Sequence, residues 1–385
     1  MSAVRRVGLN LLYLVPGETG GMETYAVQLV PAIAAARPDL ELVAFVSREA
    51  YDALENRGLG TEVGLVPVRV SGRSRVQRVG AEQLLLPRLL RRQGIQLLHS
   101  LGGTAPGWPG TASVLTLHDL IYARHPEAHT RLMTLGMRAM VPLAARSADR
   151  IIAVSEATKA EIGRVLDVPP DRVDVVYEAG RPPGPATPEP ELRARLRLGD
   201  APLVLSVSAR RPHKNLRRLL QAFAGLAEGP FLVLPGYPTP FEGELAAEVS
   251  RLGLAGRVRL LGWVSEEDLE ALYLAARCFV FPSLAEGFGL PVLEAMERGV
   301  PVACSRASSL PEVAGDAARY FDPLDVEDLR RAIAELLEDE SLRARLAAAG
   351  RDRARLFSWE RAAAETVAVY ERAWETSRHA DRASA

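Results

Sequence analysis

The chain has 385 residues, of which 48% are hydrophobic and 25% charged, and its formal net charge at pH 7 is -1. A chain longer than about 250–300 residues exceeds what one hydrophobic core supports, so we expect two domains. The balanced charge and the lack of a zinc-finger spacing argue against a nucleic-acid partner. No stretch approaches the roughly 18 consecutive apolar residues of a membrane span, so we expect a cytoplasmic protein whose membrane contact, if any, is peripheral.

In the first half of the chain, short apolar runs alternate with helical patterns. The runs that we predict as strands cover residues 7–15, 40–46, 95–99, 113–117, 151–154 and 173–177. Helical patterns at 23–36 and 156–166 lie between them. This alternation predicts an α/β fold in which helices cover both faces of a parallel sheet. The first run contains Asn10 and is followed by no small-residue cleavage site, so we interpret it as a strand and not as a signal peptide.

A proline-rich segment at residues 181–191 interrupts this rhythm, and we place the domain boundary there. A second alternating series follows it. We predict its strands at residues 203–207, 231–234, 258–261, 278–281 and 300–304, and a helix at 216–227. Cys278 and Cys304 lie in two of these strands, and we expect both to be buried, unpaired packing residues of an intracellular protein. The sequence thus predicts one doubly wound domain at 1–180 and another at 181–358.

The C-terminal segment has the pattern of a long helix. Ser358 is a suitable N-cap, and apolar residues including Trp359 and Trp374 follow on one stripe of a helix at 359–378. A helix with two tryptophans requires a large apolar partner. We expect this helix to pack back on the N-terminal domain.

A basic segment follows the first predicted strand of the second domain. In SARRPHKNLRRLL, residues 208–220, Arg210, Arg211 and Lys214 precede a helix for which Asn215 is a suitable N-cap. Cations near a helix N-terminus are unfavourable by about 0.3–1 kcal/mol each, so their crowding indicates an anion site. A solvated basic loop is the alternative. Lys214 is one of only two lysines among 47 basic residues, which favours a specific role for it.

A second signal is EGFGLPVLEAMERG, residues 286–299, directly after the strand predicted at 278–281. Its glycines let the backbone approach a ligand closely, and the N–H groups at the start of the following helix can bind phosphate or sugar oxygens. Glu286 in the loop and Glu294 in the helix supply carboxylates that accept hydrogen bonds from paired hydroxyls. A capped helix with two surface glutamates is the alternative.

Two weaker signals lie in the first domain. Gly20 and Gly21 belong to a glycine-rich turn after the first strand, but their spacing fits neither the dinucleotide fingerprint nor the Walker pattern. His118 and Asp119 end another strand, at the sheet edge where open α/β folds bind ligands. A structural histidine is the alternative there.

The region between residues 69 and 92 is rich in arginine. It contains seven arginines and one acidic residue, Glu82, beside the leucines of EQLLLPRLLRRQ. A solvated loop followed by a core helix is one interpretation. The other is a surface for anionic lipid or for a phosphate-bearing acceptor.

Taken together, these motifs resemble the retaining glycosyltransferases of family 4, which have the GT-B fold. EGFGLPVLEAM is similar to that family's Glu-x7-Glu motif, RPHKN to its basic motif and GGMETY to its glycine-rich loop, and the likeness spans the chain. It implies two Rossmann-like domains facing each other across a cleft. The acceptor would bind the N-terminal domain, and a UDP- or GDP-sugar would bind the C-terminal one without a metal or cofactor.

The resemblance also implies roles for single residues. Lys214 would neutralise the diphosphate, Glu286 would hold the donor sugar's hydroxyls, and His118 would contact the transferred sugar; these three are the catalytic candidates. Asp119 would lie on the acceptor side. The nucleotide-sugar site would comprise Gly20, Gly21, Arg210, Arg211, Lys214, Glu286, Gly287, Phe288, Gly289, Leu290 and Glu294. Where many members have Gly-Arg, this chain has Ser208 and Ala209, so the arginine that assists Lys214 stays open between Arg210 and Arg211.

We therefore predict a retaining hexosyltransferase that moves a hexose, mannose or glucose, from a nucleotide sugar to a glycan, lipid-linked or small-molecule acceptor. A GT-B nucleotide-sugar epimerase and a non-catalytic nucleotide-sugar-binding protein are the alternatives. The sequence does not identify the donor or the acceptor.

Overall fold

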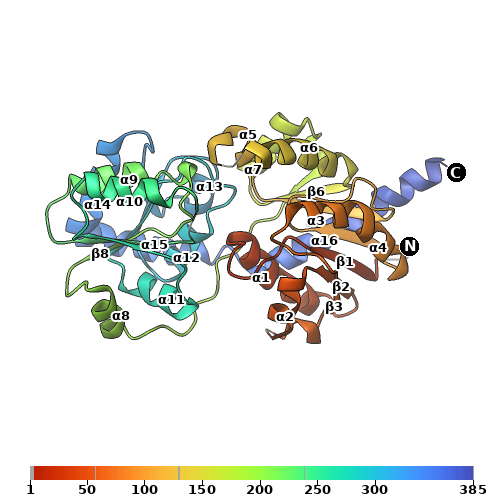
Figure 1. Cartoon of the computed structure of the whole chain (residues 1–385), viewed down its shortest axis with the longest axis horizontal. Coiled ribbons are helices and arrows are strands. Elements are labelled where there is room, and N and C mark those ends of the chain that lie inside the picture. Colours follow the sequence, from red (N-terminus) through yellow and green to blue (C-terminus); the bar gives the residue numbers. More distant parts are fainter. Residues whose placement is uncertain (1–3, 57, 129–130, 238, 385) are drawn as a thin grey trace. The chain divides into compact units, whose positions relative to one another are not determined.

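A computed structural model describes residues 4–56, 58–128, 131–237 and 239–384. Its contacts divide the chain into two compact units, and Figure 1 shows them with their elements labelled. Unit 1 comprises Met1–Glu178 and Ser358–Ala385, and unit 2 comprises Ala179–Phe357. Each unit contains one sheet in which every strand pair is parallel.

The sheet of unit 1 has seven strands in the order β3-β2-β1-β4-β5-β6-β7. The strands are β1 (Arg6–Leu11), β2 (Glu41–Val46), β3 (Gly64–Pro67), β4 (Leu97–Ser100), β5 (Ala112–Leu117), β6 (Arg150–Ala153) and β7 (Val173–Val175). The direction of winding reverses between β1 and β4, the position at which open α/β sheets bind ligands.

Helices connect these strands. They are α1 (Gly21–Ala36), α2 (Arg48–Asn56), α3 (Arg75–Gly80), α4 (Leu86–Arg92), α5 (Ile121–Arg124), α6 (Arg131–Ser147) and α7 (Glu156–Leu166), with a π-helical turn η2 (Ala81–Leu85) between α3 and α4 and short 3₁₀ turns η1 (Leu59–Thr61), η3 (Pro126–Ala128) and η4 (Pro170–Arg172). One core cluster joins α4 to β2, β4 and Leu12, which follows β1, and another joins α6 and α7 to β5 and β6. Burial on both faces explains why the central strands are predominantly apolar and do not alternate apolar with polar residues.

The C-terminal helix α16 (Trp359–Ser384) belongs to unit 1, although it follows unit 2 in the chain. Ser358 Oγ accepts a hydrogen bond from the N–H of Arg361, so the predicted N-cap is confirmed. The helix packs against α1, β5 and β6. Trp359 and Tyr370 on its apolar stripe are buried.

The sheet of unit 2 has six strands in the order β10-β9-β8-β11-β12-β13. The strands are β8 (Leu203–Leu205), β9 (Phe231–Pro235), β10 (Val258–Leu261), β11 (Cys278–Phe281), β12 (Val302–Ser305) and β13 (Ala318–Phe321). The winding reverses between β8 and β11.

Cys278 and Cys304 are buried and unpaired, as predicted.

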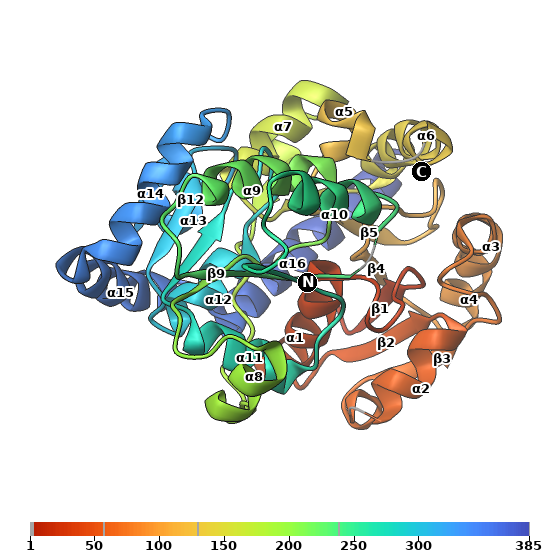
Figure 2. The same ribbon diagram turned by 60° about the vertical axis from the view of Figure 1, so that its left-hand side comes forward.

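Helices lie on both faces of this sheet; α9, α10 and α14 are on one face, and α8 and α11 on the other, in both ribbon views (Figures 1 and 2). The helices are α8 (Glu189–Leu196), α9 (Leu216–Ala224), α10 (Glu242–Arg251), α11 (Glu266–Ala275), α12 (Leu290–Glu297), α13 (Leu310–Ala314), α14 (Val326–Glu338) and α15 (Glu340–Ala354), and a 3₁₀ turn η5 (Pro212–Lys214) precedes α9. Part of the predicted linker is therefore helical, because Pro190 fits the first turn of α8.

Candidate functional site

The winding reversal in unit 2 brings the two strongest sequence signals together. Lys214 ends the turn after β8, and Glu286 follows β11, the strand next to β8. Lys214 Nζ donates to Glu286 Oε1 at 2.6 Å. The two side chains are only 16% and 10% exposed, so the ion pair is largely shielded from solvent. The structure thus joins two residues that lie 72 positions apart in the sequence.

Asn215 occupies the N-cap position of α9, but its side chain does not cap the helix. Instead Asn215 Nδ2 donates to the backbone oxygens of Pro282 at 3.0 Å and Pro323 at 2.7 Å. The prediction of a side-chain cap is wrong, because the left-handed conformation of Asn215 (φ 58°) turns the amide toward the neighbouring loops. This amide fixes the backbone next to Lys214 to the loop after β11.

The glycine-rich loop at Glu286–Leu290 is held from behind by a buried serine. Ser309 Oγ lies 3.2 Å from the backbone oxygen of Glu286 and 2.7 Å from that of Phe288. Gly289 has φ 116°, a conformation that strongly favours glycine, and α12 starts directly after it. In the first turn of α12, Pro291 has no N–H and the N–H of Val292 donates to the Gly289 oxygen at 2.9 Å, so the N–H of Leu290 is the one available to an anion. Phe288 is buried and packs edge-on against Phe357.

Glu294 lies within α12 and is 7% exposed. Tyr273 OH donates to Glu294 Oε2 at 2.9 Å. Burial raises the pKa of Glu294, while the charge of Arg181 and the Tyr273 hydrogen bond act in the opposite direction. A carboxylate held in this way retains further acceptor capacity for hydroxyl groups.

The two candidate arginines have different surroundings. Arg210 is 3% exposed, and its guanidinium bonds Glu242 and the backbone oxygen of Leu261. These contacts fasten the segment after β8 to β10 and α10, so Arg210 serves the packing of unit 2. Arg211 is partly exposed beside the turn that carries Lys214. It is the better candidate for a second positive charge.

The glycine-rich turn of unit 1 begins α1. Gly20 has φ 60° and ψ −134°, a conformation essentially confined to glycine, and Gly21 is the first residue of the helix. The turn is tied back to α1 because the N–H of Gly17 donates to Glu23 Oε2 at 2.8 Å. This loop therefore presents backbone at the carboxyl end of β1.

His118 is held at both ring nitrogens. Nδ1 lies 2.9 Å from Glu178 Oε1, and Nε2 lies 2.9 Å from the backbone oxygen of Leu101. Both partners are acceptors, which favours the doubly protonated ring. Burial lowers the pKa of His118, but the hydrogen bond and charge of Glu178 outweigh it, and the net shift is upward. His118 is therefore suited to electrostatic and steric contact, and not to accepting a proton.

Asp119 makes a local contact, since its Oδ1 accepts a hydrogen bond from the N–H of Ile121 at 2.9 Å.

Four residues that the sequence did not single out contact the candidate residues of the two units. They are Glu178, Tyr273, Ser309 and Arg298. Glu178 follows β7 in VVYEAG, so reading the polar residue after every strand would have found it. Tyr273 lies within α11, Ser309 directly before α13, and Arg298, which donates to the Glu294 backbone oxygen at 3.0 Å, directly after α12; none of the three carries a comparable signal.

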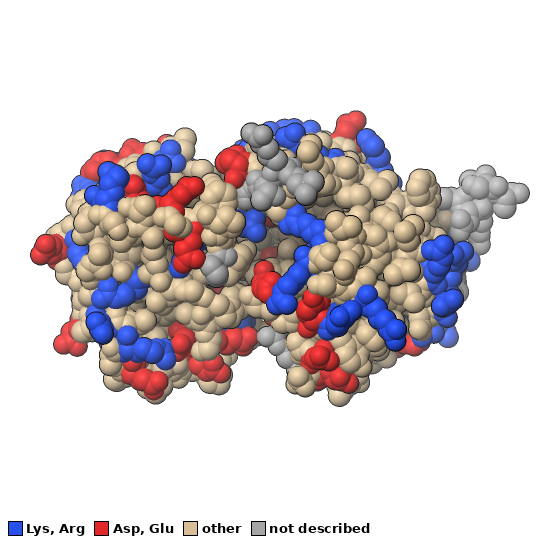
Figure 3. Space-filling view, in the orientation of Figure 1, with Lys and Arg blue, Asp and Glu red and all other residues tan. Residues whose placement is uncertain are grey.

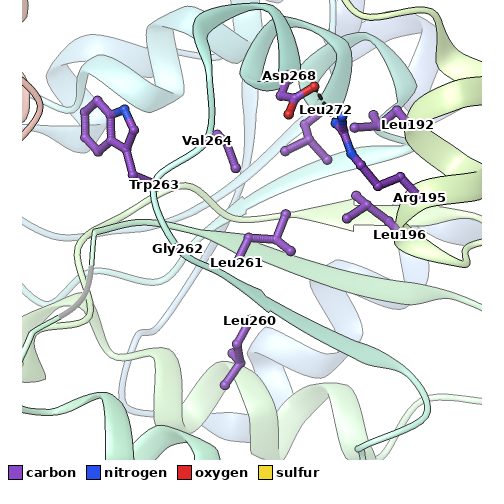
Figure 4. A pocket seen from close by; sticks show the side chains of 10 residues that line it. All are labelled: Leu192, Arg195, Leu196, Leu260, Leu261, Gly262, Trp263, Val264, Asp268 and Leu272. Carbon is purple, nitrogen blue, oxygen red and sulfur yellow. Dashed lines mark hydrogen bonds and ion pairs between the residues drawn. The ribbon is translucent and has the colours of Figure 1, made fainter.

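A separate cavity of about 300 Å³ lies between α8, β10 and α11, and Figure 4 shows its lining side chains. Leucines dominate the lining, Trp263 stands at its rim, and Arg195 Nη2 donates to Asp268 Oδ1 at 2.5 Å. None of the candidate site residues lines it. Among the described residues, no cluster of three or more His, Cys, Asp and Glu could hold a metal ion, and no helix is long and apolar enough to cross a membrane.

Comparisons with known proteins identify the family of the chain. Residues 188–353 match the family Glycosyl transferases group 1, and residues 19–179 match Glycosyltransferase Family 4. The chain is 34% identical to the O-antigen chain mannosyltransferase B of Escherichia coli over 91% of this chain and 95% of that protein. It is 36% identical to the MMP alpha-(1->4)-mannosyltransferase of Mycolicibacterium hassiacum, over 62% of this chain and 57% of that one.

Among solved structures, Alr3699/HepE of Anabaena in complex with UDP and glucose superposes with a TM-score of 0.75. It is 22% identical and is matched over 95% of this chain and 99% of its own. At that identity the likeness establishes the fold. The chain belongs to the group 1, family 4 glycosyltransferases and has their GT-B fold.

Proposed function

We propose that this hexosyltransferase transfers a mannosyl group, with retention of the anomeric configuration, from GDP-mannose to a hydroxyl of a carbohydrate acceptor. The observation that carries the proposal is the Lys214–Glu286 ion pair at the β8–β11 reversal. This pair supports the proposal because its cation suits a diphosphate and its carboxylate suits sugar hydroxyls. The choice of mannose rests on the two mannosyltransferases to which the chain is similar.

In this proposal Lys214 stabilises the departing diphosphate, with Arg211 as the second charge. A preorganised cation at the leaving group is worth several kcal/mol in the transition state. Glu286 orients the sugar, Glu294 accepts hydrogen bonds from the ribose, and the N–H of Leu290 at the start of α12 binds a phosphate oxygen. No metal is required, so turnover should persist in EDTA.

The chemical step exchanges one bond for another at the anomeric carbon. The acceptor oxygen bonds to that carbon on the face from which the diphosphate leaves. The acceptor proton passes to the departing diphosphate, and the products are a glycoside and GDP. His118 does not act as the base in this scheme, since both of its nitrogens already face acceptors.

A panel of nucleotide diphosphates and nucleotide sugars tests the proposal. GDP should raise the melting temperature more than UDP does, because a ligand that binds only the native state stabilises it. GDP-mannose with a mannose-containing acceptor should yield an α-linked product. A larger shift with UDP would overturn the donor assignment. Release of an epimerised sugar, or binding with no product, would instead support the epimerase or the non-catalytic alternative.

We also propose peripheral contact with an anionic membrane through α3, η2 and α4. Val76 on α3 is 86% exposed and Leu84 in η2 is 63% exposed. Trp108, which is 85% exposed, lies in the loop after β4, and the neighbouring Gly107 bonds Gln83 of η2. The exposed arginines of this region lie at positions 75, 88, 91 and 92. Apolar side chains among cations fit the boundary of an anionic bilayer. On unit 2, by contrast, Figure 3 shows charges of both signs interspersed.

Co-sedimentation with phosphatidylglycerol vesicles tests the membrane contact. Binding should be strong at low salt and weak at about 0.5 M salt, because screening shortens the range of electrostatic attraction. Replacement of Leu84 and Trp108 by serine should weaken it further. Equal binding to neutral phosphatidylcholine vesicles, or none at low salt, would contradict the proposal.

A further inference from the structure

A buried carboxylate lies in the π-helical turn η2, where no part of the proposed mechanism uses it. Glu82 is 1% exposed. Its Oε1 accepts hydrogen bonds from Asn10 Nδ2 at 3.3 Å and from Thr104 Oγ1 at 3.1 Å. π-Helical turns inside α-helices are rare and occur frequently at functional sites. The turn is what directs Glu82 inward between α3 and α4.

This carboxylate lies at the winding reversal of the unit 1 sheet. Asn10 is near the carboxyl end of β1, and Ser100 is the last residue of β4, the strand across the reversal. Asn10 Nδ2 reaches Ser100 Oγ at 3.4 Å as well as Glu82. Glu82 therefore faces the edge of the sheet at which doubly wound folds bind their ligands.

Two polar atoms at this place lack hydrogen-bond partners among the described residues. They are Glu82 Oε2 and Arg78 Nε, and both are buried. The two residues are four apart, so they lie on the same face of the helical segment. A buried acceptor and a buried donor without hydrogen-bond partners are costly unless a ligand or water satisfies them. Burial raises the pKa of Glu82, and the nearby charge of Arg78 opposes that shift.

The loop beside Glu82 is rigidly held and leads to His118. Gln83 fixes it from the same turn, since Gln83 Nε2 donates to the Ala105 oxygen at 2.9 Å and the N–H of Gly107 donates to Gln83 Oε1 at 2.9 Å. Gly102 packs so closely on the Tyr13 ring that a Cβ there would approach it to 2.3 Å. The same loop carries the Leu101 oxygen that bonds His118 Nε2.

We infer that Arg78 and Glu82 form a subsite that binds one hydroxyl of the acceptor carbohydrate. A hydroxyl oxygen accepts from Arg78 Nε while its hydrogen is donated to Glu82 Oε2, so a single group satisfies both atoms. Thr104, which donates to Glu82 Oε1, is partly exposed. This subsite rests on the proposed transfer to a carbohydrate and assigns the residues that select its acceptor.

Binding and kinetics with α-mannobiose as the probe test the inference in the full-length protein. Glu82→Gln keeps the size of the side chain and the acceptor for Thr104, but it removes the charge. Loss of a hydrogen bond to a charged group should weaken mannobiose binding and raise its KM by about 10- to 100-fold. The GDP-induced shift in melting temperature, which reports on unit 2, should stay unchanged. Glu55→Gln, an exposed glutamate on α2, is the matched control.

Arg78→Lys provides a second variant should Glu82→Gln fail to fold, because Arg78 is only partly buried. It keeps the charge, removes the Nε donor and should also raise the KM for mannobiose. Unaltered affinity in both folded variants, or no binding of mannobiose to the wild type, would overturn the subsite. If mannobiose binds in a Glu82-dependent manner but no sugar is transferred, the subsite is supported and the proposed function is refuted.

Discussion

Lys214 Nζ and Glu286 Oε1 form a 2.6 Å ion pair between the turn after β8 and the loop after β11. Burying either charge alone would cost several kcal/mol, so each holds the other in place. In the proposed complex, a bound diphosphate sugar would replace this ion pair. The Lys214 ammonium would then bind phosphate, and the Glu286 carboxylate would accept a hydrogen bond from a sugar hydroxyl. The two partners should therefore respond differently to substitution.

Lys214→Ala should lower kcat by about 10²- to 10³-fold, because one preorganised charge at the leaving group is lost. The measurement is steady-state transfer at saturating donor. Lys214→Arg should restore only part of the lost kcat. The planar guanidinium of arginine keeps the charge but does not reproduce the contact of a compact ammonium with phosphate oxygens. Lys159→Ala on α7 replaces the other lysine of the chain and serves as control. Near-normal turnover in folded Lys214→Ala would remove this residue from the mechanism.

Glu286→Gln should raise the KM for the nucleotide sugar by about 10-fold or more while leaving the affinity for the bare nucleotide diphosphate equal or higher. The reason is that the carboxylate is assigned to the sugar, and its removal frees Lys214 for phosphate. Calorimetric titration with GDP and with GDP-mannose separates the two effects. A parallel loss of affinity for both ligands would show that Glu286 acts on the diphosphate as well.

The sequence predicted the strands that are buried on both sides, because their apolar runs are unbroken. It missed β3 and β13. β3 contains Gly64 and Pro67 and is partly exposed, and β13 contains Arg319 and buries only Phe321 fully, so neither has the composition of a core strand. The first strand was predicted to reach residue 15 but ends at Leu11, since a turn begins where the N–H of Leu14 bonds the Leu11 oxygen.

The sequence singled out candidate site residues only where they lie in the segment that follows a predicted strand. Lys214, Glu286 and His118 were proposed on that ground. Their partners were not, because Glu178 reaches His118 from 60 residues away and Tyr273 reaches Glu294 from another helix. Nor could the sequence assign Arg210, because adjacent arginines look alike until the fold turns one of them toward Glu242.

Glu297→Gln should change how the stability of the protein depends on pH. Burial, opposed by Arg298 and reinforced by Glu294 and Glu270, raises the pKa of Glu297 to about 7. The folded state therefore binds this proton more tightly than the unfolded state. Its stabilising effect is present below pH 4.5 and is lost as the pH rises through 7. The wild-type melting temperature should fall more between pH 5.5 and pH 8 than that of the variant.

Glu338→Gln, an exposed glutamate on α14, is the control for this comparison and should keep the wild-type pH profile. Identical profiles for the wild type and Glu297→Gln would show that Glu297 is ionised in the folded protein throughout this range.

Tyr370→Phe should destabilise unit 1 by about 1–3 kcal/mol, because it leaves a buried imidazole nitrogen without its partner. His99 Nδ1 lies 2.7 Å from Tyr370 OH on α16, and Nε2 lies 2.8 Å from Thr116 Oγ1 on β5. Burial, with the like charge of His118, lowers the pKa of His99 to about 3, so the ring is neutral and depends on these two bonds. Urea unfolding should show the loss, and Tyr51→Phe on α2 should not. Because the phenol removed belongs to α16 and the histidine to β4, an unchanged midpoint would mean that this hydrogen bond does not help to hold the C-terminal helix on the sheet.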